Sequence, residues 1–185
     1  HSLLSYLIDE GLALELTAGY YYIINLFTTI EIKIKLTKKG LAEYERVCEI
    51  VFEYLRILRD HGVNKRIFEE LQQISKLKFD YKDKEKPINY VTTLSSRMHY
   101  FPIEDIVRVE FMQETFRPEL LQKIIDSLTL ENLRIYLISK SLEKECTKTE
   151  KWYGTKYDFE PLSQKIKDLF ANPKVGPSKS GKILD

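Results

Sequence analysis

The spacing of hydrophobic residues changes from helical to alternating near the start of the chain. Between Leu3 and Gly11, apolar residues recur at the three- and four-residue intervals of a helix face, and the closing glycine suits a left-handed helix end. From Leu16 to Leu36 the chain is first aromatic and β-branched, and then alternates between aliphatic and charged residues. This pattern predicts a short helix followed by two strands, the second with one face in water.

The middle of the chain is predicted to be mostly helical. Thr37 and Asn64 suit N-caps, Gly62 suits a helix end, and several prolines favour first helical turns. Alternation returns later as a predicted strand, and a last short helix follows it. The predicted helices run from Thr37 to Gly62, Asn64 to about Phe79, Pro87 to Ser96, Ile103 to Phe111, Glu119 to Leu128 and Pro161 to Phe170, with the strand from Leu133 to Leu137.

This order of elements predicts an α+β fold. Early strands, a helical middle and a late strand favour a mostly antiparallel sheet with helices packed on one face. We expect a single domain over residues 1–170. Residues 171–185 are rich in lysine, serine, glycine and proline, and we interpret them as a loose tail with little to bury.

Charge and composition narrow the class of protein. The 185 residues include 29 Lys and Arg against 28 Asp and Glu, a net charge of +1, which does not favour nucleic acid as a partner. The longest apolar run, from Gly19 to Phe27, is too short to span a bilayer, so no membrane association is expected. Cys48 and Cys146 fit no metal or redox spacing, and a reduced, cytoplasmic protein is the simplest interpretation.

The residues give little support for catalysis. His1, His61 and His99 form none of the zinc-peptidase motifs, and the chain has no nucleophile elbow, phosphate-binding glycine loop or C-x-x-C motif. One segment, Leu16 to Tyr22, indicates binding: small residues precede an aromatic strand start, so the strand could pair with an extended peptide if it lies at a sheet edge. From these residues alone, a turn into a buried strand is the favoured interpretation.

A series of short motifs, in order, resembles the insulysin family of inverzincin zinc peptidases. The similarity extends from Ser2 to about Phe170, and the pattern is lost beyond it. The motifs are Ser2-Leu3-Leu4-Ser5, Leu36-Thr37 with Gly40, Lys82 to Pro87, His99-Tyr100-Phe101-Pro102, Phe116-Arg117-Pro118, Ser139-Lys140-Ser141 and Trp152-Tyr153-Gly154-Thr155. Each is weak alone, but their common order is specific.

The resemblance implies the second, noncatalytic domain of the amino-terminal half of such a peptidase. In the family this domain helps to line the closed chamber in which peptides are cleaved. The zinc-binding H-x-x-E-H motif belongs to the preceding domain and has no counterpart here. The chain by itself is therefore expected to have no cofactor and no peptidase activity, while the parent protein is a zinc metalloendopeptidase.

The resemblance also implies two binding sites. In the family, the segment that matches Leu16, Thr17, Ala18, Gly19 and Tyr20 is an edge strand, called the exosite, which holds the amino end of a substrate peptide. Two glycines are usual where this chain has Ala18-Gly19. A basic residue at the position of Lys86 contributes to an anion site for ATP or polyphosphate, where lysine keeps the charge but lacks the two-pronged geometry of arginine.

Two functional hypotheses follow. In the first, the chain is a structural and peptide-anchoring domain of an insulysin-like peptidase, and its partners are extended peptides and the remaining domains of that enzyme. In the alternative, it is a stand-alone truncated relative that acts as a peptide-binding or regulatory partner of a full-length peptidase. Neither hypothesis involves nucleic acid or a membrane.

Overall fold

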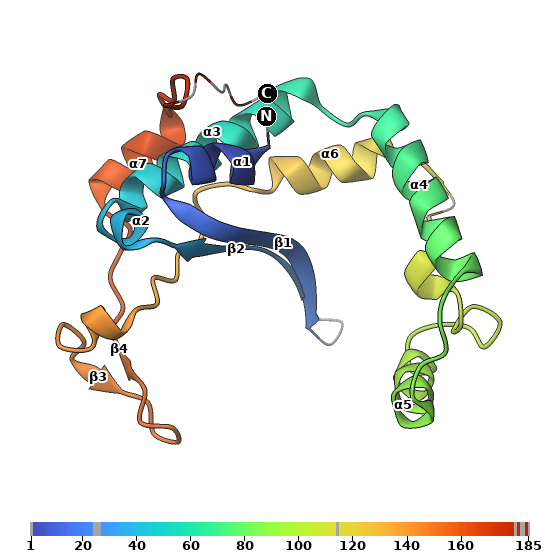
Figure 1. The fold of residues 1–185 in the computed structure, drawn as a ribbon. Coiled ribbons are helices and arrows are strands. Elements are labelled where there is room, and N and C mark those ends of the chain that lie inside the picture. Colours follow the sequence, from blue (N-terminus) through green and yellow to red (C-terminus); the bar gives the residue numbers. More distant parts are fainter. Residues whose placement is uncertain (1, 24–26, 114, 180, 182–183, 185) are drawn as a thin grey trace. The chain divides into compact units, whose positions relative to one another are not determined.

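The computed structural model describes residues 2–23, 27–113, 115–179, 181 and 184. The chain divides into two compact units. The first combines His1–Asp60 with Asp126–Asp185, and the second comprises His61–Ile125. Figure 1 labels the elements of both units.

The first unit opens with a helix and a long β-hairpin (Figure 1). Helix α1 (Leu3–Asp9) is capped by Ser2, whose hydroxyl accepts from the Ser5 N–H. Gly11 follows with φ +69°, which allows the turn into strand β1 (Ala13–Ile23). Strand β2 (Phe27–Leu36) pairs with β1 in antiparallel fashion. The predicted helix and both predicted strands are confirmed.

Two helices replace the single one predicted between Thr37 and Gly62. Helix α2 (Lys38–Ala42) begins as predicted at Thr37, whose hydroxyl accepts from the Gly40 N–H at 2.9 Å. Its turn ends at Glu43, and helix α3 (Tyr44–His61) follows immediately. The apolar stripe predicted for this region is present in α3, where Val47 and Ile50 are buried in the core.

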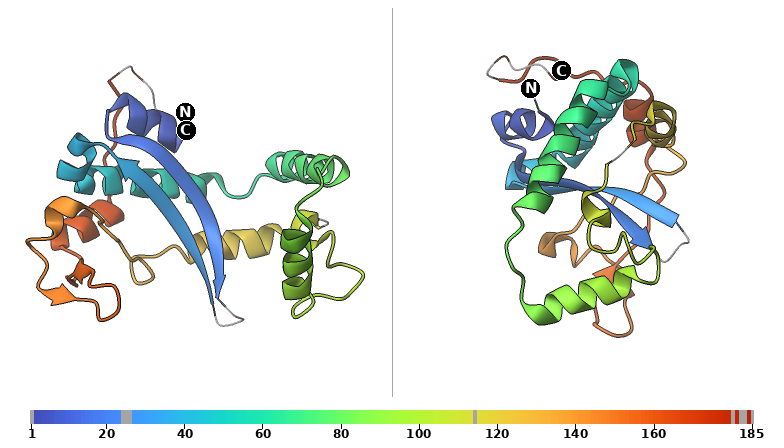
Figure 2. Two further views of the ribbon diagram at one scale, coloured as in Figure 1. Left: turned by 60° about the horizontal axis from the view of Figure 1, so that its bottom comes forward. Right: turned by 90° about the vertical axis from the view of Figure 1, so that its right-hand side faces the viewer.

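The core of the first unit lies between α1, the start of β1 and α3. On another side, α3 packs against helix α7 (Gln164–Ala171), where the Phe52 and Phe170 rings meet edge to face at 5.0 Å. Figure 2 shows α1, α3 and the base of the hairpin from two further sides. The buried hydrophobic residues of this core are Leu3, Tyr6, Leu7, Leu12, Ala13, Val47, Ile50 and Leu184.

The described residues of the predicted tail make specific contacts. The Tyr6 hydroxyl donates to the Gly176 carbonyl at 2.7 Å, and the Lys174 N–H donates to Glu49 at 3.1 Å. Leu184 is buried in the core. The tail therefore has more to bury than its composition indicates, because α1 offers an aromatic hydroxyl and an apolar surface to a segment distant in sequence.

The late part of the first unit holds a second, very short hairpin. A 3₁₀ turn, η2 (Lys140–Leu142), precedes strands β3 (Lys148–Thr149) and β4 (Lys156–Tyr157), which pair antiparallel. The strand predicted at Leu133–Leu137 is wrong. Its side chains alternate in exposure, but it joins neither hairpin among the described residues, and an extended segment becomes a strand only when a neighbour supplies ladder hydrogen bonds.

The second unit contains helices α4 (Lys65–Asp80), α5 (Pro87–Arg97), the 3₁₀ turn η1 (Val109–Phe111) and most of α6 (Pro118–Asp126). The Asn64 side chain caps α4 as predicted, by accepting from the Arg66 N–H. The helix predicted at Ile103–Phe111 is wrong, because successive three-residue hydrogen bonds, such as Asp105 N–H to the Pro102 carbonyl, fold this segment into turns.

The fold class is α+β, as predicted, but the arrangement of the strands differs from the predicted single sheet. The described residues form seven helices and two separate two-stranded antiparallel hairpins, in place of one sheet covered by helices on one face. The prediction of one domain over residues 1–170 stays a prediction. None of the described helices combines the length and apolar character needed to cross a bilayer.

Candidate functional site

The segment Leu16–Tyr20, predicted to bind peptides, lies in the middle of β1. It pairs residue by residue with Ile30–Ile34 of β2, so that Gly19 faces Glu31 across the ladder. Among the described residues, β2 is the only strand that pairs with β1. The opposite edge of β1 therefore has no strand partner in the described part of the chain. In an antiparallel ladder, alternate residues direct their N–H and C=O groups to that side, where a further strand can pair.

The β1–β2 hairpin has one polar and one apolar face. Because successive side chains of a strand point to opposite sides, the register separates polar from apolar side chains over Glu15–Tyr21 and the paired residues Thr29–Lys35. The polar face carries Glu15, Thr17, Gly19, Tyr21, Thr29, Glu31, Lys33 and Lys35. The apolar face carries Leu16, Ala18, Tyr20, Ile30, Ile32 and Ile34.

The apolar face is buried only near the base of the hairpin. Leu16 and Ile34 are half-buried against the core of the first unit. Farther along, Ala18, Tyr20 and Ile30 are exposed, with 75% of Tyr20 accessible. Four of the five predicted site residues, Thr17 to Tyr20, thus lie on an exposed stretch of strand, while Leu16 ties that stretch to the core. The interpretation of a buried strand does not fit this segment.

Lys33 organises the polar face. Its ammonium donates to the Tyr21 hydroxyl at 2.9 Å, lies 4.9 Å from the centre of the same ring, and pairs with Glu31 at 3.0 Å. The hydrogen bond to Tyr21, followed by that to Glu31, raises the pKa of Lys33 above its ordinary value. A depression of about 210 Å³ lies beside these groups, lined by Thr17, Gly19, Tyr20, Tyr21, Glu31 and Lys33. The predicted binding segment therefore contributes three of the six residues that line this concave surface.

The base of the hairpin is locked by Thr37 and Gly40. The Thr37 N–H donates to the Leu12 carbonyl at 3.0 Å, and its hydroxyl donates to the Gly11 carbonyl at 2.8 Å. Gly40 is buried so closely that a Cβ atom there would lie 1.9 Å from the Leu12 carbonyl oxygen. The sequence contains Thr37 and Gly40 as a motif, but their contact with Leu12 depends on the turn of the chain through β1 and β2.

Lys86, the predicted anion-binding residue, precedes α5 in the second unit. It is exposed and occupies the N-cap position without a side-chain capping bond, and Pro87 starts the helix as predicted. Nearby, Lys82 forms an ion pair with Glu85 and lies 5.5 Å from the centre of the Phe111 ring. An exposed lysine can meet an anion, but these contacts do not test that role, and anion binding by Lys86 stays a prediction.

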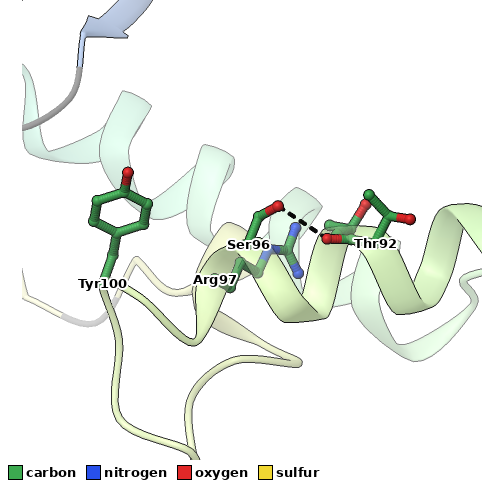
Figure 3. Close-up of a pocket in the computed structure, with 5 residues that line it drawn as sticks. Thr92, Ser96, Arg97 and Tyr100 are labelled. Carbon is green, nitrogen blue, oxygen red and sulfur yellow. Dashed lines mark hydrogen bonds between the residues drawn. The ribbon is translucent and has the colours of Figure 1, made fainter.

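Another depression lies on α5, with a volume of about 310 Å³ (Figure 3). Thr92, Thr93, Ser96, Arg97 and Tyr100 line it. Two of its polar side chains already have partners: the Ser96 hydroxyl donates to the Thr92 carbonyl, and Arg97 donates to the Ile106 carbonyl and pairs with Glu110. No ligand is indicated by this arrangement.

The described residues do not provide a set of metal ligands. No group of three or more His, Cys, Asp or Glu side chains in this part of the chain is arranged to hold a metal ion. Zinc sites of peptidases require at least three such side chains converging on one point.

Comparison with models of protein families shows to which family the chain belongs. A family model described as "Middle or third domain of peptidase_M16" matches residues 79–180, more than half of the chain. The chain belongs to the peptidase M16 family. The predicted membership of the insulysin and pitrilysin family, with a noncatalytic middle domain, is thereby confirmed. The match runs past Phe170, into the segment interpreted from sequence as a tail.

Individual M16 peptidases match a larger share of the chain than the family model does. Insulin-degrading enzyme from Homo sapiens is 34% identical over 165 residues, which cover 89% of this chain and 16% of that protein. Nardilysin from Homo sapiens is 30% identical over 144 residues, or 78% of this chain and 12% of that protein. A crystal structure of pitrilysin superposes with a TM-score of 0.83 at 26% identity, over 92% of this chain and 18% of that chain.

The chain spans less than a fifth of the length of these M16 relatives. In the M16 family the middle domain lacks the zinc site, while the parent proteins are metallopeptidases. This chain is therefore a noncatalytic middle domain of an M16 peptidase.

Proposed function

We propose that this M16 middle domain anchors extended peptides along the free edge of β1 and contributes to the wall of a peptidase chamber. Cleavage would take place at a zinc centre carried by a different domain of the parent enzyme. The observation that carries the proposal is the exposed stretch Thr17–Tyr20, which pairs with β2 on one side only among the described residues. A peptide added there would extend a two-stranded sheet to three strands.

The free energy gained by strand pairing is too small for tight binding and suits a role in positioning the peptide. A segment as long as Leu16–Tyr20 can form roughly five main-chain hydrogen bonds with an added strand, each worth about 0.5–1.5 kcal/mol net. Association itself costs about 4–15 kcal/mol. Pairing alone thus gives weak binding. It becomes useful when a second part of the same peptide occupies a neighbouring catalytic site, because each contact then raises the effective concentration at the other.

The composition of the hairpin suits peptides of varied sequence. Main-chain groups supply the pairing, and the polar face is close to electrically balanced, since Lys33 pairs with Glu31 and Lys35 pairs with Glu15 at 3.1 Å. Such a surface neither attracts nor repels peptides strongly by charge. The partners that we propose are therefore extended peptides together with the remaining domains of the parent peptidase.

A binding measurement with a modified peptide tests this proposal. A short fluorescent peptide in extended form is titrated with the full chain, and its anisotropy is recorded. The matched control has the same side chains but carries N-methyl groups on alternate residues, in both possible phases, which removes the donors needed for strand pairing. We expect measurable binding of the unmodified peptide and its loss in one of the two methylated forms. Equal binding of all three peptides, or of none, would contradict anchoring through β1.

A further inference from the structure

Gly19 leaves a gap in the polar face of the hairpin. A Cβ atom at this position would meet nothing within 4 Å, although the neighbouring positions on the same face carry the larger side chains of Thr17 and Tyr21. Across the ladder, Lys33 pairs with Thr17 and Thr29 pairs with Tyr21, so the Gly19–Glu31 pair lies between them. The contact of Lys33 with Tyr21 therefore spans the gap, and the depression of about 210 Å³ opens beside it.

The walls of this gap suit an uncharged aromatic ring. Half of the Tyr21 side chain is accessible, so its ring can stack with another one. The Lys33 ammonium lies 4.9 Å from the centre of the Tyr21 ring and can also interact with the face of a second ring. Since Glu31 pairs with this ammonium, an acidic ligand would have to compete with an existing ion pair, and a basic ligand would meet a lysine.

We propose that a peptide bound along β1 is selected for an aromatic side chain at the one position that lies beside Gly19 on the polar face. This inference rests on the proposed anchoring function. An aromatic residue on a neighbouring strand covers the backbone that a glycine leaves exposed, an arrangement used to stabilise glycines in designed sheets. The β2 residue opposite Gly19 is Glu31, so β2 places no aromatic residue directly across from this glycine.

The register limits the preference to a single peptide position. Neighbouring peptide residues on the same face would lie beside Thr17 and Tyr21, whose side chains occupy the space that Gly19 leaves empty. Peptide residues between them would point to the apolar face, beside Ala18 and Tyr20. An aromatic side chain two positions away from the preferred one therefore gains less, and the preference identifies the register of the bound peptide.

Two variants distinguish the effect of the gap beside Gly19 from the effect of main-chain pairing along the edge of β1. Gly19→Val fills the depression with a residue that favours strands, and Gly19 has neither a positive φ nor an atom in the way. Thr28→Val places the same residue in β2, at an exposed position on the opposite face of the hairpin and outside the predicted binding segment. Both variants leave the main-chain edge of β1 available for pairing, and far-UV circular dichroism checks that each remains folded.

The experiment uses a series of otherwise identical peptides in which one phenylalanine is moved through successive positions of an alanine- and threonine-rich background. With the unaltered chain we expect one position to bind about three- to tenfold more tightly than its neighbours, from the worth of one aromatic contact. Gly19→Val should reduce this advantage to less than about twofold, whereas Thr28→Val should preserve it. A position-independent affinity, or equal loss in both variants, would overturn the aromatic preference. Absence of binding by every peptide would instead contradict the anchoring function itself.

Discussion

Replacing Gly40 by alanine tests how the base of the β1–β2 hairpin is held. A Cβ atom at this position would lie 1.9 Å from the Leu12 carbonyl oxygen and 2.9 Å from its carbon. The shorter contact has to open by about 1 Å before it approaches the separations that Cβ atoms adopt in proteins. Leu12 is fully buried, and its carbonyl accepts from the Thr37 N–H, so it cannot move without disturbing the core and this hydrogen bond.

Two opposing effects decide whether Gly40→Ala raises or lowers the free energy of unfolding. Gly40 lies within α2, where alanine is intrinsically favoured over glycine by about 1 kcal/mol. Overpacking of a buried position costs about 1–3 kcal/mol, and weakening of the Thr37 bond adds about 0.5–1.5 kcal/mol. The clash therefore outweighs the helix propensity, and we expect a net destabilisation of about 1–3 kcal/mol, a substantial share of a typical total of about 5–15 kcal/mol.

Urea unfolding of the full chain, followed by circular dichroism and by amide hydrogen exchange in β1, measures this effect. Gly19→Ala is the matched control, because the same substitution there meets no atom within 4 Å. We expect Gly40→Ala to lower the unfolding midpoint and the protection of β1, and Gly19→Ala to leave the free energy of unfolding unchanged or to raise it by up to about 1 kcal/mol. Equal or higher stability of Gly40→Ala would refute the close contact between α2 and Leu12.

Three further predictions concern single side chains. Tyr6→Phe removes the donor to the Gly176 carbonyl; it should lower the free energy of unfolding by about 0.5–1.5 kcal/mol and speed proteolysis after residue 171, and unchanged cleavage would contradict the tail contact. Burial raises the pKa of Cys48 to about 11, so iodoacetamide at neutral pH should modify it in urea but hardly in the folded chain, as mass spectrometry can show. The Thr147 hydroxyl, followed by the Phe159 N–H, lowers the pKa of Asp158 from 3.8 to about 2. Its stabilising hydrogen bonds are thus complete above pH 3.8 and lost as the pH falls through about 2; a carboxyl NMR titration with a midpoint near 3.8 would contradict them.

Local signals in the sequence predict the elements whose ends are fixed by nearby residues. Thr37 and Asn64 cap helices, and Pro87 starts one, because capping and proline effects act within a single turn. Leu133–Leu137 alternates as a strand does, yet pairs with neither hairpin among the described residues. Alternation reports which side chains share a face, whereas a strand also needs a partner that local sequence does not supply.

The candidate site shows the same division between local and distant information. The aromatic and small residues of Leu16–Tyr20 indicate a strand that another backbone can approach, but only the pairing with β2 shows which edge is open. The depression beside Gly19 was not predicted, because it depends on Lys33 reaching across the ladder to Tyr21. Alternation in both strands, read with their register, is the signal that could have placed Gly19, Glu31 and Lys33 on one face.

Peptide anchoring along β1 is tested most directly by NMR. An isotopically labelled full chain is titrated with an extended peptide, and amide shifts and inter-strand contacts are recorded. The proposal predicts that the largest shifts fall on Leu16–Tyr20, with smaller shifts on the paired residues Ile30–Ile34, and that peptide protons show contacts to β1 typical of neighbouring strands. Saturating peptide that shifts only amides of the second unit, or leaves Leu16–Tyr20 unchanged, would contradict it.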